Sequence, residues 1–319
     1  MDACEKIPVL AVVGPTASGK TALAVRLAKQ FGAEIISADS MQIYSDLYVS
    51  TARPDETEMQ GVPHHLLGFL PADQPYSAAD FCAMAKACAA DIHSRGKRVI
   101  LCGGTGLYVQ SFLENITFTG EGGDPDFRAK MHRIAEEQGN EAVWRELSAV
   151  DPDGAQALHP NNLGRVIRAL EIYRITGLTT AQHRVQSRLE PSPYRSLVLC
   201  LDFQDRQKLY ARIDLRVQEM LRRGLEAEAR RFFERYGTDS GTARQAIGCK
   251  EFLPYFRGEI PYAQAVESIC RGTRRYAKRQ LTWFRRMPGI QTIYADAQQD
   301  VFDQALERID ADGLFSSGG

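Results

Sequence analysis

A segment near the N-terminus carries the residues of a phosphate-binding loop. The stretch "GPTASGKT" runs from Gly14 to Thr21 and matches the pattern GxxxxGK[ST]. Gly14 and Gly19 allow the backbone to curl so that its N–H groups point at phosphate oxygens. Lys20 can bridge those oxygens, and the Thr21 hydroxyl can hold Mg²⁺. Most loops of this kind bind ATP or GTP, so the motif predicts a phosphate without saying whose phosphate it is.

Two other stretches place polar side chains where a ligand can reach them. "SADSMQIY" (37–44) carries Asp39 and Ser40, and "CGGTGLYV" (102–109) carries Thr105. An aspartate there can serve Mg²⁺ or act as a base on a substrate, although capping of a following helix explains it equally well. The glycines of 102–109 permit close approach of a ligand, and turn chemistry alone also accounts for them.

Cations recur at helical spacing in the second half of the chain. In "RIDLRVQEMLRRGLEAEARRF" (212–232), Ile213, Val217, Met220 and Leu221 lie on one face, and Arg212 and Arg216 are i, i+4 neighbours on another. Paired guanidinium groups suit a diphosphate, but a solvated helix face is an equal alternative. "RGTRRYAKRQLTWFRR" (271–286) mixes seven basic residues with aromatic ones, a pattern that fits nucleic acid. Its aromatic residues also fit a helix core, the reading favoured for Trp283.

The charge is unevenly distributed. Of the 319 residues, 1–160 carry 13 basic and 21 acidic side chains, a net charge of −8, whereas 161–319 carry 26 and 19, a net charge of +7. Within 161–286 there are 25 basic and 13 acidic residues, a net charge of +12. Such a block can follow a polyanion, or it can form internal ion pairs on solvated helices. Charge alone therefore does not identify the partner.

Short apolar runs separated by helical segments define the elements that must position these residues. They predict an α/β fold in which a P-loop NTPase-like parallel sheet is flanked by helices. Ser77 and Asp80 form a capping box ahead of one such helix, and Gly32 suits the end of the helix after the phosphate loop. The predicted strands are "IPVLAVV" (7–13), "EIISA" (34–38), "RVILC" (98–102), "SLVLCLDF" (196–203) and, more weakly, "QTIYA" (291–295).

The character of the chain changes between residues 118 and 194. "TGEGGDPD" precedes a group of charged helices, and "EPSPYR" follows it. We therefore predict a catalytic core made of 1–117 and 195–319, interrupted by a helical insertion at 118–194.

The remaining composition predicts a cytoplasmic protein that does not associate with membranes. No apolar run approaches the ~20 residues of a membrane span, and no signal peptide is evident. The seven cysteines are odd in number and lack zinc-finger spacing, so free, mostly buried thiols are expected. The adjacent His64 and His65 are expected to pack in a loop, because neighbouring histidines rarely aim at one metal ion.

Taken together, nine stretches in order resemble the tRNA dimethylallyltransferase family, also called tRNA isopentenyltransferases, of the bacterial type. They cover roughly residues 8–290 and read "GPTASGKT", "SADSMQIY", "TARP", "GVPHHLLG", "GGTGLYV", "HPNNLGRVIRALEIY", "RIDLRVQEMLRRGLEAE", "QAIGCKEF" and "YAKRQLTWFR". The resemblance implies transfer of a dimethylallyl group from its diphosphate to the exocyclic amine of the adenosine 3′ of the anticodon. The phosphate loop then holds the leaving diphosphate, which leaves open whether ATP binds at all.

The resemblance also implies roles for particular residues. Asp39 matches the general base, Thr105 lies near the attacking amine, and Arg216 offsets charge on the leaving group. Mg²⁺ is the expected cofactor, held at Thr21, and the partners are dimethylallyl diphosphate and the tRNA anticodon stem-loop. The diphosphate-binding residues are Gly14, Thr16, Ala17, Ser18, Gly19, Lys20, Thr21 and Arg212. The tRNA-binding residues are Asp39, Ser40, Met41, Gln42, Thr105, Arg128, Gly164, Arg165, Val166, Ile167, Arg168, Gln245 and Lys250.

Four positions depart from the family pattern: Tyr48, Ser50, Arg53 and Cys249 stand where Asp, Gly, Lys and Tyr are usual. They concern RNA contacts and the loop after Asp39. Three other functions compete: a small-molecule kinase, an enzyme that prenylates free adenine nucleotides, and an RNA-binding ATPase. The kinase leaves the basic block without a purpose, and a free nucleotide needs neither that block nor the insertion. A monomer is expected.

Overall fold

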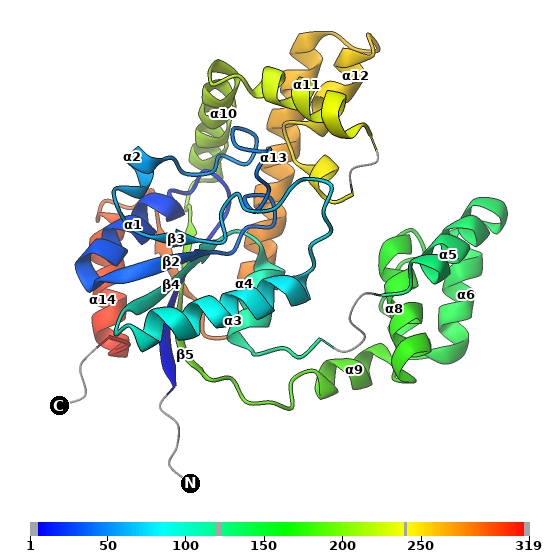
Figure 1. Cartoon of the computed structure of the whole chain (residues 1–319), viewed down its shortest axis with the longest axis horizontal. Helices are drawn as coiled ribbons and strands as arrows, with labels where there is room; N and C mark the ends of the chain where they lie inside the picture. The colour runs from blue at the N-terminus through cyan, green and yellow to red at the C-terminus, as the bar shows by residue number, and fades with distance from the viewer. Residues whose placement is uncertain (1–5, 119–122, 239–240, 316–319) are drawn as a thin grey trace. The chain divides into compact units, whose positions relative to one another are not determined.

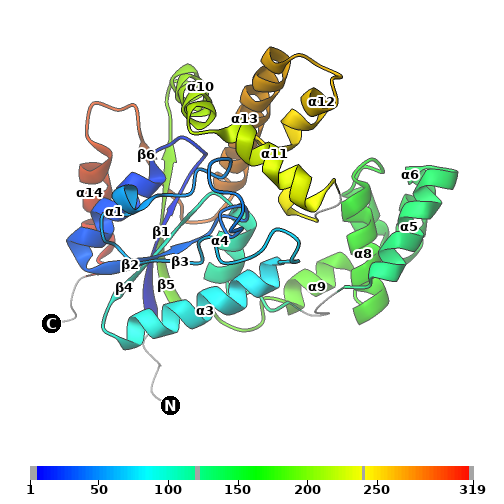
Figure 2. The same cartoon turned by 45° about the horizontal axis from the view of Figure 1, so that its top comes forward.

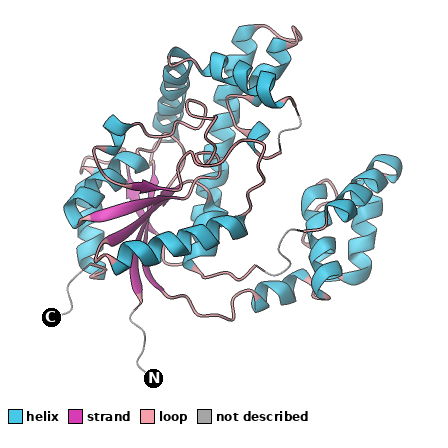
Figure 3. Cartoon of the chain, in the orientation of Figure 1, coloured by secondary structure: helices cyan, strands magenta, loops and turns pink. Residues whose placement is uncertain are grey.

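The computed structural model describes residues 6–118, 123–238 and 241–315. Its centre is a parallel sheet of six strands in the order β3-β2-β4-β1-β5-β6 (Figures 1 and 3). All registered strand pairs are parallel, so the carboxyl ends of the strands meet at one edge. The strands are β1 (Ile7–Val13), β2 (Ala33–Ser37), β3 (His64–His65), β4 (Arg98–Gly103), β5 (Tyr194–Asp202) and β6 (Gln291–Tyr294).

The apolar runs predicted the five longer strands to within one or two residues at each end. β1 is buried along most of its length because it lies between β4 and β5, which explains its continuous run of aliphatic side chains. The prediction of a loop at His64 was wrong, because His64 and His65 pair with Ile35 and Ile36 as a short edge strand. Two residues are too few to show an alternating pattern.

Helices cover both faces of the sheet. α1 (Lys20–Phe31) and α14 (Val301–Asp312) share one apolar cluster with the strands. α3 (Ala78–Ser94) and α4 (Gly106–Leu113) pack on each other, with the Phe81 and Tyr108 rings stacked 4.3 Å apart. The predicted capping box of Ser77 and Asp80 is present at the start of α3, and Gly32 ends α1 with a φ of 61°.

A second apolar cluster lies beside the carboxyl edge. It joins the loop residues Ile43, Tyr44 and Leu47 to buried side chains of three helices, and partly buried side chains of a fourth pack against it. Figure 2 shows these four helices near one another. These helices are α10 (Arg206–Arg222), α11 (Leu225–Tyr236), α12 (Leu253–Phe256) and α13 (Tyr262–Phe284), with short turns of 3₁₀ helix at Ala243–Gln245 and Lys250–Phe252. The cluster fixes the loop after β2 against these helices, and this loop carries Asp39.

The chain divides into two compact units, one made of 1–113 and 193–319 and the other of 114–192. The described part of the smaller unit is helical, as predicted, with boundaries within four residues of those expected. The helices of the smaller unit are α5 (Pro125–Gln138), α6 (Asn140–Val150), α7 (Pro152–Gln156), α8 (Leu163–Thr176) and α9 (Thr180–Gln186). The "TGEG" stretch ahead of them is residues 119–122, outside the described residues.

The six cysteines in the described ranges are free thiols, and four of them are buried. Burial raises the pKa of Cys102 to about 11, so this thiol stays protonated at neutral pH. A search of the described helices finds none with the length and apolar character that a membrane span requires.

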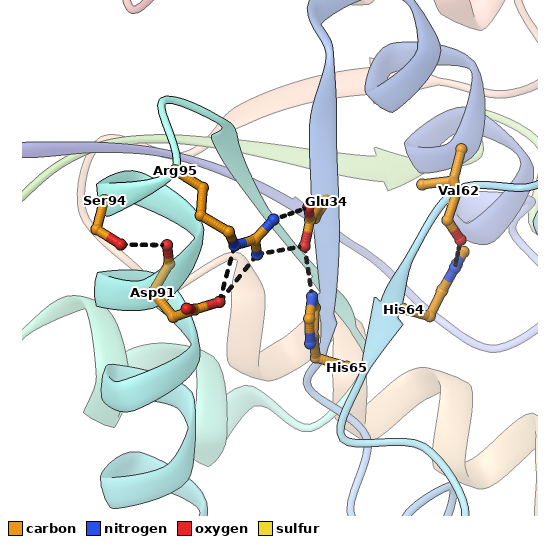
Figure 4. A network of polar contacts seen from close by, with 7 residues as sticks. All are labelled: Glu34, Val62, His64, His65, Asp91, Ser94 and Arg95. Carbon is orange, nitrogen blue, oxygen red and sulfur yellow. Dashed lines mark hydrogen bonds and ion pairs between the residues drawn. The ribbon is translucent and has the colours of Figure 1, made fainter.

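An ion-pair network ties the start of β2 to β3 and α3 (Figure 4). The carboxylate of Glu34 is buried and accepts hydrogen bonds from both Nη atoms of Arg95, at 2.5 and 2.8 Å, and contacts His65 Nε2 at 2.8 Å. Asp91 pairs with the same guanidinium at 2.9 Å. Hydrogen bonds from Arg95 lower the pKa of Glu34 to about 2, although burial acts in the opposite direction.

Replacing Glu34 should therefore destabilise the fold in a pH-dependent manner. We expect Glu34→Gln to lower the free energy of unfolding by about 1–3 kcal/mol at pH 7. Because the folded-state pKa is depressed, the stabilisation is present above the unfolded pKa of about 4.3 and is lost as the pH falls toward 2. Urea unfolding of both proteins from pH 7 to pH 3.5 measures this, with the exposed Glu56→Gln as control. A difference that stays constant below pH 4.3 contradicts the assignment.

Candidate functional site

The phosphate loop has the backbone geometry that its glycines predicted. Gly14 and Gly19 have φ of 148° and 93°, Ala17 also lies in the left-handed region at 63°, and α1 begins at Lys20. A Cβ on Gly14 would stand 2.8 Å from the Leu201 carbonyl oxygen, so only glycine fits there. The hydroxyl of Ser18 is buried and has no hydrogen-bond partner within the described chain. An unpartnered polar atom under a curled loop fits an oxyanion as its missing partner.

Asp39 serves as a cap and also keeps a free oxygen. Its Oδ1 accepts hydrogen bonds from the backbone N–H groups of Met41 at 2.9 Å and Gln42 at 3.4 Å. Its Oδ2 has no such bond to any residue that the structure describes. The alternatives of a capping residue and a chemically active carboxylate are therefore compatible. One oxygen shapes the turn while the other remains available to a ligand.

Thr105 joins the loop after β4 to the loop after β2. Its Oγ1 accepts a hydrogen bond from Ser40 N at 2.9 Å and lies 3.2 Å from Ser40 Oγ. Its own N–H donates to the Ala38 carbonyl at 3.1 Å. These bonds hold Thr105 next to the turn that Asp39 caps.

The glycines around Thr105 allow other segments of the chain to pack closely against this loop. A Cβ at Gly103 would stand 2.2 Å from the Ala38 carbonyl oxygen, and one at Gly104 would stand 2.1 Å from Gln280 Nε2. At Gly106 it would meet the Trp283 ring at 2.3 Å. Close packing within the protein is a third reason for these glycines, beside the ligand approach and the turn chemistry considered from the sequence.

Three cations, Lys20, Arg212 and Arg216, converge on the phosphate loop, and none of them forms an ion pair with a described carboxylate, although Asp39 and Glu58 lie near Arg216. Arg212 Nε donates to the Ala17 carbonyl at 2.9 Å, and neither Arg212 nor Arg216 forms an ion pair with any described residue. Burial, followed by the nearby Arg216 guanidinium, lowers the pKa of Lys20. Burial also lowers the pKa of Arg216, and the charge of Asp39 acts against that change. Cations held together at this cost favour an anionic ligand.

One cavity of about 800 Å³ brings most of the predicted residues of the larger unit together. Gly14, Ser18 and Thr105 are not among its lining residues, but Thr105 is hydrogen-bonded to the lining residue Ser40. The predicted residues that line it are Thr16, Ala17, Gly19, Lys20, Thr21, Asp39, Ser40, Met41, Gln42, Arg212, Arg216, Gln245 and Lys250. Residues that motif reasoning did not assign also line it: Ala22, Val49, Ser50, Thr51, Ala52, Pro54, Glu58, Leu215, Val217, Glu219, Met220, Arg223, Ala246, Ile247, Thr273, Tyr276, Arg279 and Gln280.

The cavity wall at 49–52 is held by an unpredicted residue. Glu228 of α11 is buried, and its carboxylate accepts hydrogen bonds from the N–H groups of Tyr48, Val49 and Ser50 at 2.9, 2.7 and 2.8 Å. Three backbone donors satisfy the buried charge. The only sequence signal was a glutamate on the apolar side of an amphipathic helix.

The departures from the family pattern cluster at this wall. The guanidinium groups of Arg53 and Arg223 lie 4.8 and 5.6 Å from the centre of the Tyr48 ring. Cys249 is fully buried next to Ser50. These side chains pack the wall, while the phosphate loop retains every residue of its motif.

A cation site at the loop would use few protein ligands. Thr21 offers a hard oxygen ligand of the kind that Mg²⁺ prefers, and it lines the cavity together with Lys20 and Asp39. The described residues contain no cluster of three or more His, Cys, Asp or Glu side chains able to hold a metal. This donor set fits an ion that takes most of its ligands from water and phosphate.

The predicted RNA-binding residues of the helical unit differ in their availability. Arg128 and Arg168 both pair with the carboxylate of Glu171. Glu171 is fully buried, whereas the two arginine side chains are nearly half exposed. Burial raises the pKa of Glu171, but hydrogen bonds from Arg128 and its neighbours hold it at about 2. Gly164 and Arg165 begin α8. The side chains of Val166 and Ile167 are buried in the unit's core, and the role of this segment in RNA binding stays a prediction.

A phosphate-loop motif after β1, with cations and a carboxylate at the same edge of a parallel sheet, places the chain among P-loop-like α/β proteins. Comparison with known proteins narrows the class. The family model of IPP transferase matches residues 42–287, and the chain belongs to this family.

Named relatives and solved structures agree. The tRNA dimethylallyltransferase of Thermoanaerobacter sp. is 44% identical over 292 residues, which cover 91% of this chain and 92% of that protein. A tRNA isopentenylpyrophosphate transferase from Bacillus halodurans has a similar structure, with a TM-score of 0.71, 38% identity and coverage of 98% of this chain and 97% of that one. A eukaryotic dimethylallyltransferase acting on tRNA has a TM-score of 0.83, 30% identity and coverage of 98% and 80%.

Proposed function

We propose that this chain transfers a dimethylallyl group from dimethylallyl diphosphate to the N6 amine of the adenosine 3′ of the anticodon in tRNA, releasing diphosphate. The observation that carries the proposal is the single cavity in which Lys20, Arg216 and Asp39 meet. The two cations suit the leaving diphosphate, and the carboxylate suits the proton that the amine loses. Relatives named for this reaction support the choice of substrates.

The donor binds with its charged and apolar ends in different parts of the cavity. The diphosphate lies on the loop from Gly14 to Thr21, where backbone N–H groups and the start of α1 favour negative charge. The dimethylallyl group lies against apolar lining residues, which include Val49, Met220 and Ile247.

The amine nitrogen attacks the allylic carbon, and the bond from that carbon to the diphosphate oxygen breaks. The leaving oxygen keeps the electron pair, and Arg216 and Lys20 stabilise the charge that it gains. The free Oδ2 of Asp39 accepts the proton from the amine. The adenine must leave its stack to reach this site, which costs a few kcal/mol that contacts elsewhere on the RNA offset.

Mg²⁺ is the cation that this site suits, and Thr21 would hold it. When bound, it neutralises charge on the diphosphate. The residues of the chain bind and orient the two substrates around it.

An uncompensated cationic stripe on α13 supports RNA as the acceptor. Arg274 and Arg285 pair with Asp214 and Asp202, but the other cations of this stretch have no carboxylate within 4.0 Å in the described ranges. The unpaired side chains are Arg271, Arg275, Lys278, Arg279 and Arg286. They follow each other at helical spacing on the exposed side. Arg279 is itself a cavity-lining residue, and so is the neighbouring Tyr276. Trp283 is 37% exposed beside them, so it is less buried than its favoured core role implied.

Neutralising two of these cations should weaken RNA binding and its salt dependence together. We expect Arg275→Gln/Lys278→Gln to lower the slope of log affinity against log salt by about 2, or about 1 per lost phosphate contact. The rate constant at saturating RNA should change little, because neither side chain lines the cavity. Filter binding of an anticodon stem-loop between about 50 and 200 mM salt measures the slope. The exposed Arg308→Gln on α14 is the control, and an unchanged slope in the double variant argues against a phosphate track on α13.

We also propose that the helical unit contributes contacts to the anticodon stem-loop, through Arg165 and the exposed edges of Arg128 and Arg168. A monomeric cytoplasmic enzyme remains the prediction from sequence.

The test is a transfer assay with dimethylallyl diphosphate, Mg²⁺ and unmodified anticodon stem-loop RNA. Parallel reactions replace the donor with ATP or the RNA with free AMP. Prenylated adenosine in the RNA alone is the expected result. Product with AMP alone indicates a free-nucleotide enzyme, and ATP hydrolysis without transfer indicates an ATPase.

A further inference from the structure

Gln280 of α13 connects two loops at the edge of the sheet. Its side chain is buried, with 5% exposure. Its Oε1 accepts a hydrogen bond from the N–H of Thr16 at 2.9 Å, and its Nε2 donates to the Gly104 carbonyl oxygen at 2.9 Å. Thr16 belongs to the phosphate loop after β1, and Gly104 immediately precedes Thr105 after β4. One amide group therefore bridges the ends of two neighbouring strands.

A glycine at position 104 is needed for the Gln280 amide to sit between the two loops. A Cβ on Gly104 would stand 2.1 Å from Gln280 Nε2 and 3.5 Å from the Gly14 carbonyl oxygen. The absence of a side chain at Gly104 thus lets the amide reach both loops. The donor and acceptor ends of the amide cannot be exchanged, because Thr16 offers an N–H and Gly104 offers a carbonyl.

The bridge continues to the carboxylate. Thr105 follows Gly104 and accepts a hydrogen bond from Ser40 N at 2.9 Å, and Asp39 precedes Ser40. A continuous path of hydrogen bonds and peptide links thus runs from the phosphate loop through Gln280 and Thr105 to Asp39, the residue proposed as base. Backbone bonds between β1 and β4 end with the pair Val13 and Gly103, so the two loops beyond them need another link.

We propose that Gln280 is a positioning residue that sets the separation between the diphosphate-binding loop and the loops carrying Thr105 and Asp39. This inference rests on the proposed transfer reaction. Gln280 acts on the rate by fixing where the allylic carbon lies relative to the attacking amine. Misplacement by about 1 Å can cost about 100-fold in rate. Its loss should therefore lower kcat more than it weakens either substrate's binding.

Two replacements of similar volume test the bridge. Gln280→Met removes both hydrogen bonds and should lower kcat about 10–100-fold at every pH. Gln280→Glu keeps an acceptor for Thr16 but points a second oxygen at the Gly104 carbonyl. The charged form repels that carbonyl, whereas the protonated form donates to it as the amide does. A carboxyl group in this buried position gains a proton more readily than one in water.

The informative quantity is kcat of each variant divided by kcat of the wild type, measured from pH 8.5 to 5.5, about the range in which such a group titrates. Division removes the pH dependence that all three proteins share. We expect the Gln280→Glu ratio to rise several-fold as the pH falls and the Gln280→Met ratio to stay low and flat. Wild-type kcat in either folded variant, or flat ratios in both, overturns the proposal. Thr282→Ala, an exposed change on the same helix, is the control.

A measurement on the wild type keeps the proposal testable if the variants do not fold. Hydrogen exchange should show the Thr16 amide protected without any ligand, because a buried side chain holds it. Rapid exchange at Thr16 overturns the bridge. This readout is independent of activity, so it also separates failure of the bridge from failure of the proposed transfer reaction.

Discussion

Asp39→Asn is expected to lower the single-turnover rate of dimethylallyl transfer about 10²–10⁴-fold, the usual contribution of a general base. The amide oxygen can still accept the bonds that Met41 and Gln42 donate to Oδ1, so the turn should keep its shape. What is lost is the free Oδ2 that takes the proton. Affinity for the RNA should stay within about twofold, because most phosphate contacts lie elsewhere. Rapid quench measures transfer, and filter binding measures affinity.

Asp39→Ala separates the two functions of this side chain. It removes the base and the cap, so it should match Asp39→Asn in rate but also lose about 1 kcal/mol of stability. The exposed Asp73→Asn is the control and should leave both quantities unchanged. If Asp39→Asn retains the wild-type rate, the base is another group. If it is slow and also unfolds as readily as Asp39→Ala, the carboxylate matters mainly for the turn.

The strands and the phosphate loop could be predicted because their causes are local. A buried parallel strand needs a continuous apolar run, and a curled anion-binding loop needs Gly14 and Gly19. The short edge strand at His64 was missed because β3 exists only through its register with Ile35 and Ile36. Pairing between residues 29 positions apart, 35 with 64 and 36 with 65, leaves no local pattern.

The residues of the site also fall into those with a local cause in the sequence and those without one. Residues at the ends of predicted strands, such as Asp39 and Thr105, could be placed at one edge from topology alone. Glu228 and Gln280 could not, because each acts through backbone atoms about 180 or more positions away in sequence. Composition likewise could not show that Glu171 already engages Arg128 and Arg168, since burial of a carboxylate depends on how α5 and α8 pack.

The cations at the phosphate loop carry a free-energy cost in the ligand-free protein. Burial lowers the pKa values of both Lys20 and Arg216, and their charges repel. A base whose folded-state pKa is depressed destabilises the fold at any pH below its unfolded pKa, which for arginine includes all physiological values. No described carboxylate pairs with Arg216 to offset this. A bound diphosphate supplies the missing negative charge, so the cost is recovered when the donor binds.

Arg216→Gln should therefore change activity and stability in opposite directions. Transfer should slow about 10²–10³-fold, because one preorganised donor to the developing charge is lost. The ligand-free protein should unfold at a temperature about 2–4 °C higher, which corresponds to about 1 kcal/mol. The increase in Tm that inorganic diphosphate and Mg²⁺ give the wild type should shrink. Thermal melts with and without diphosphate, alongside rapid quench, measure all three, and Arg206→Gln at the start of α10 is the control. A less stable Arg216→Gln protein would mean that Asp39 already compensates this charge, and the argument from unpaired cations to a diphosphate ligand would fail.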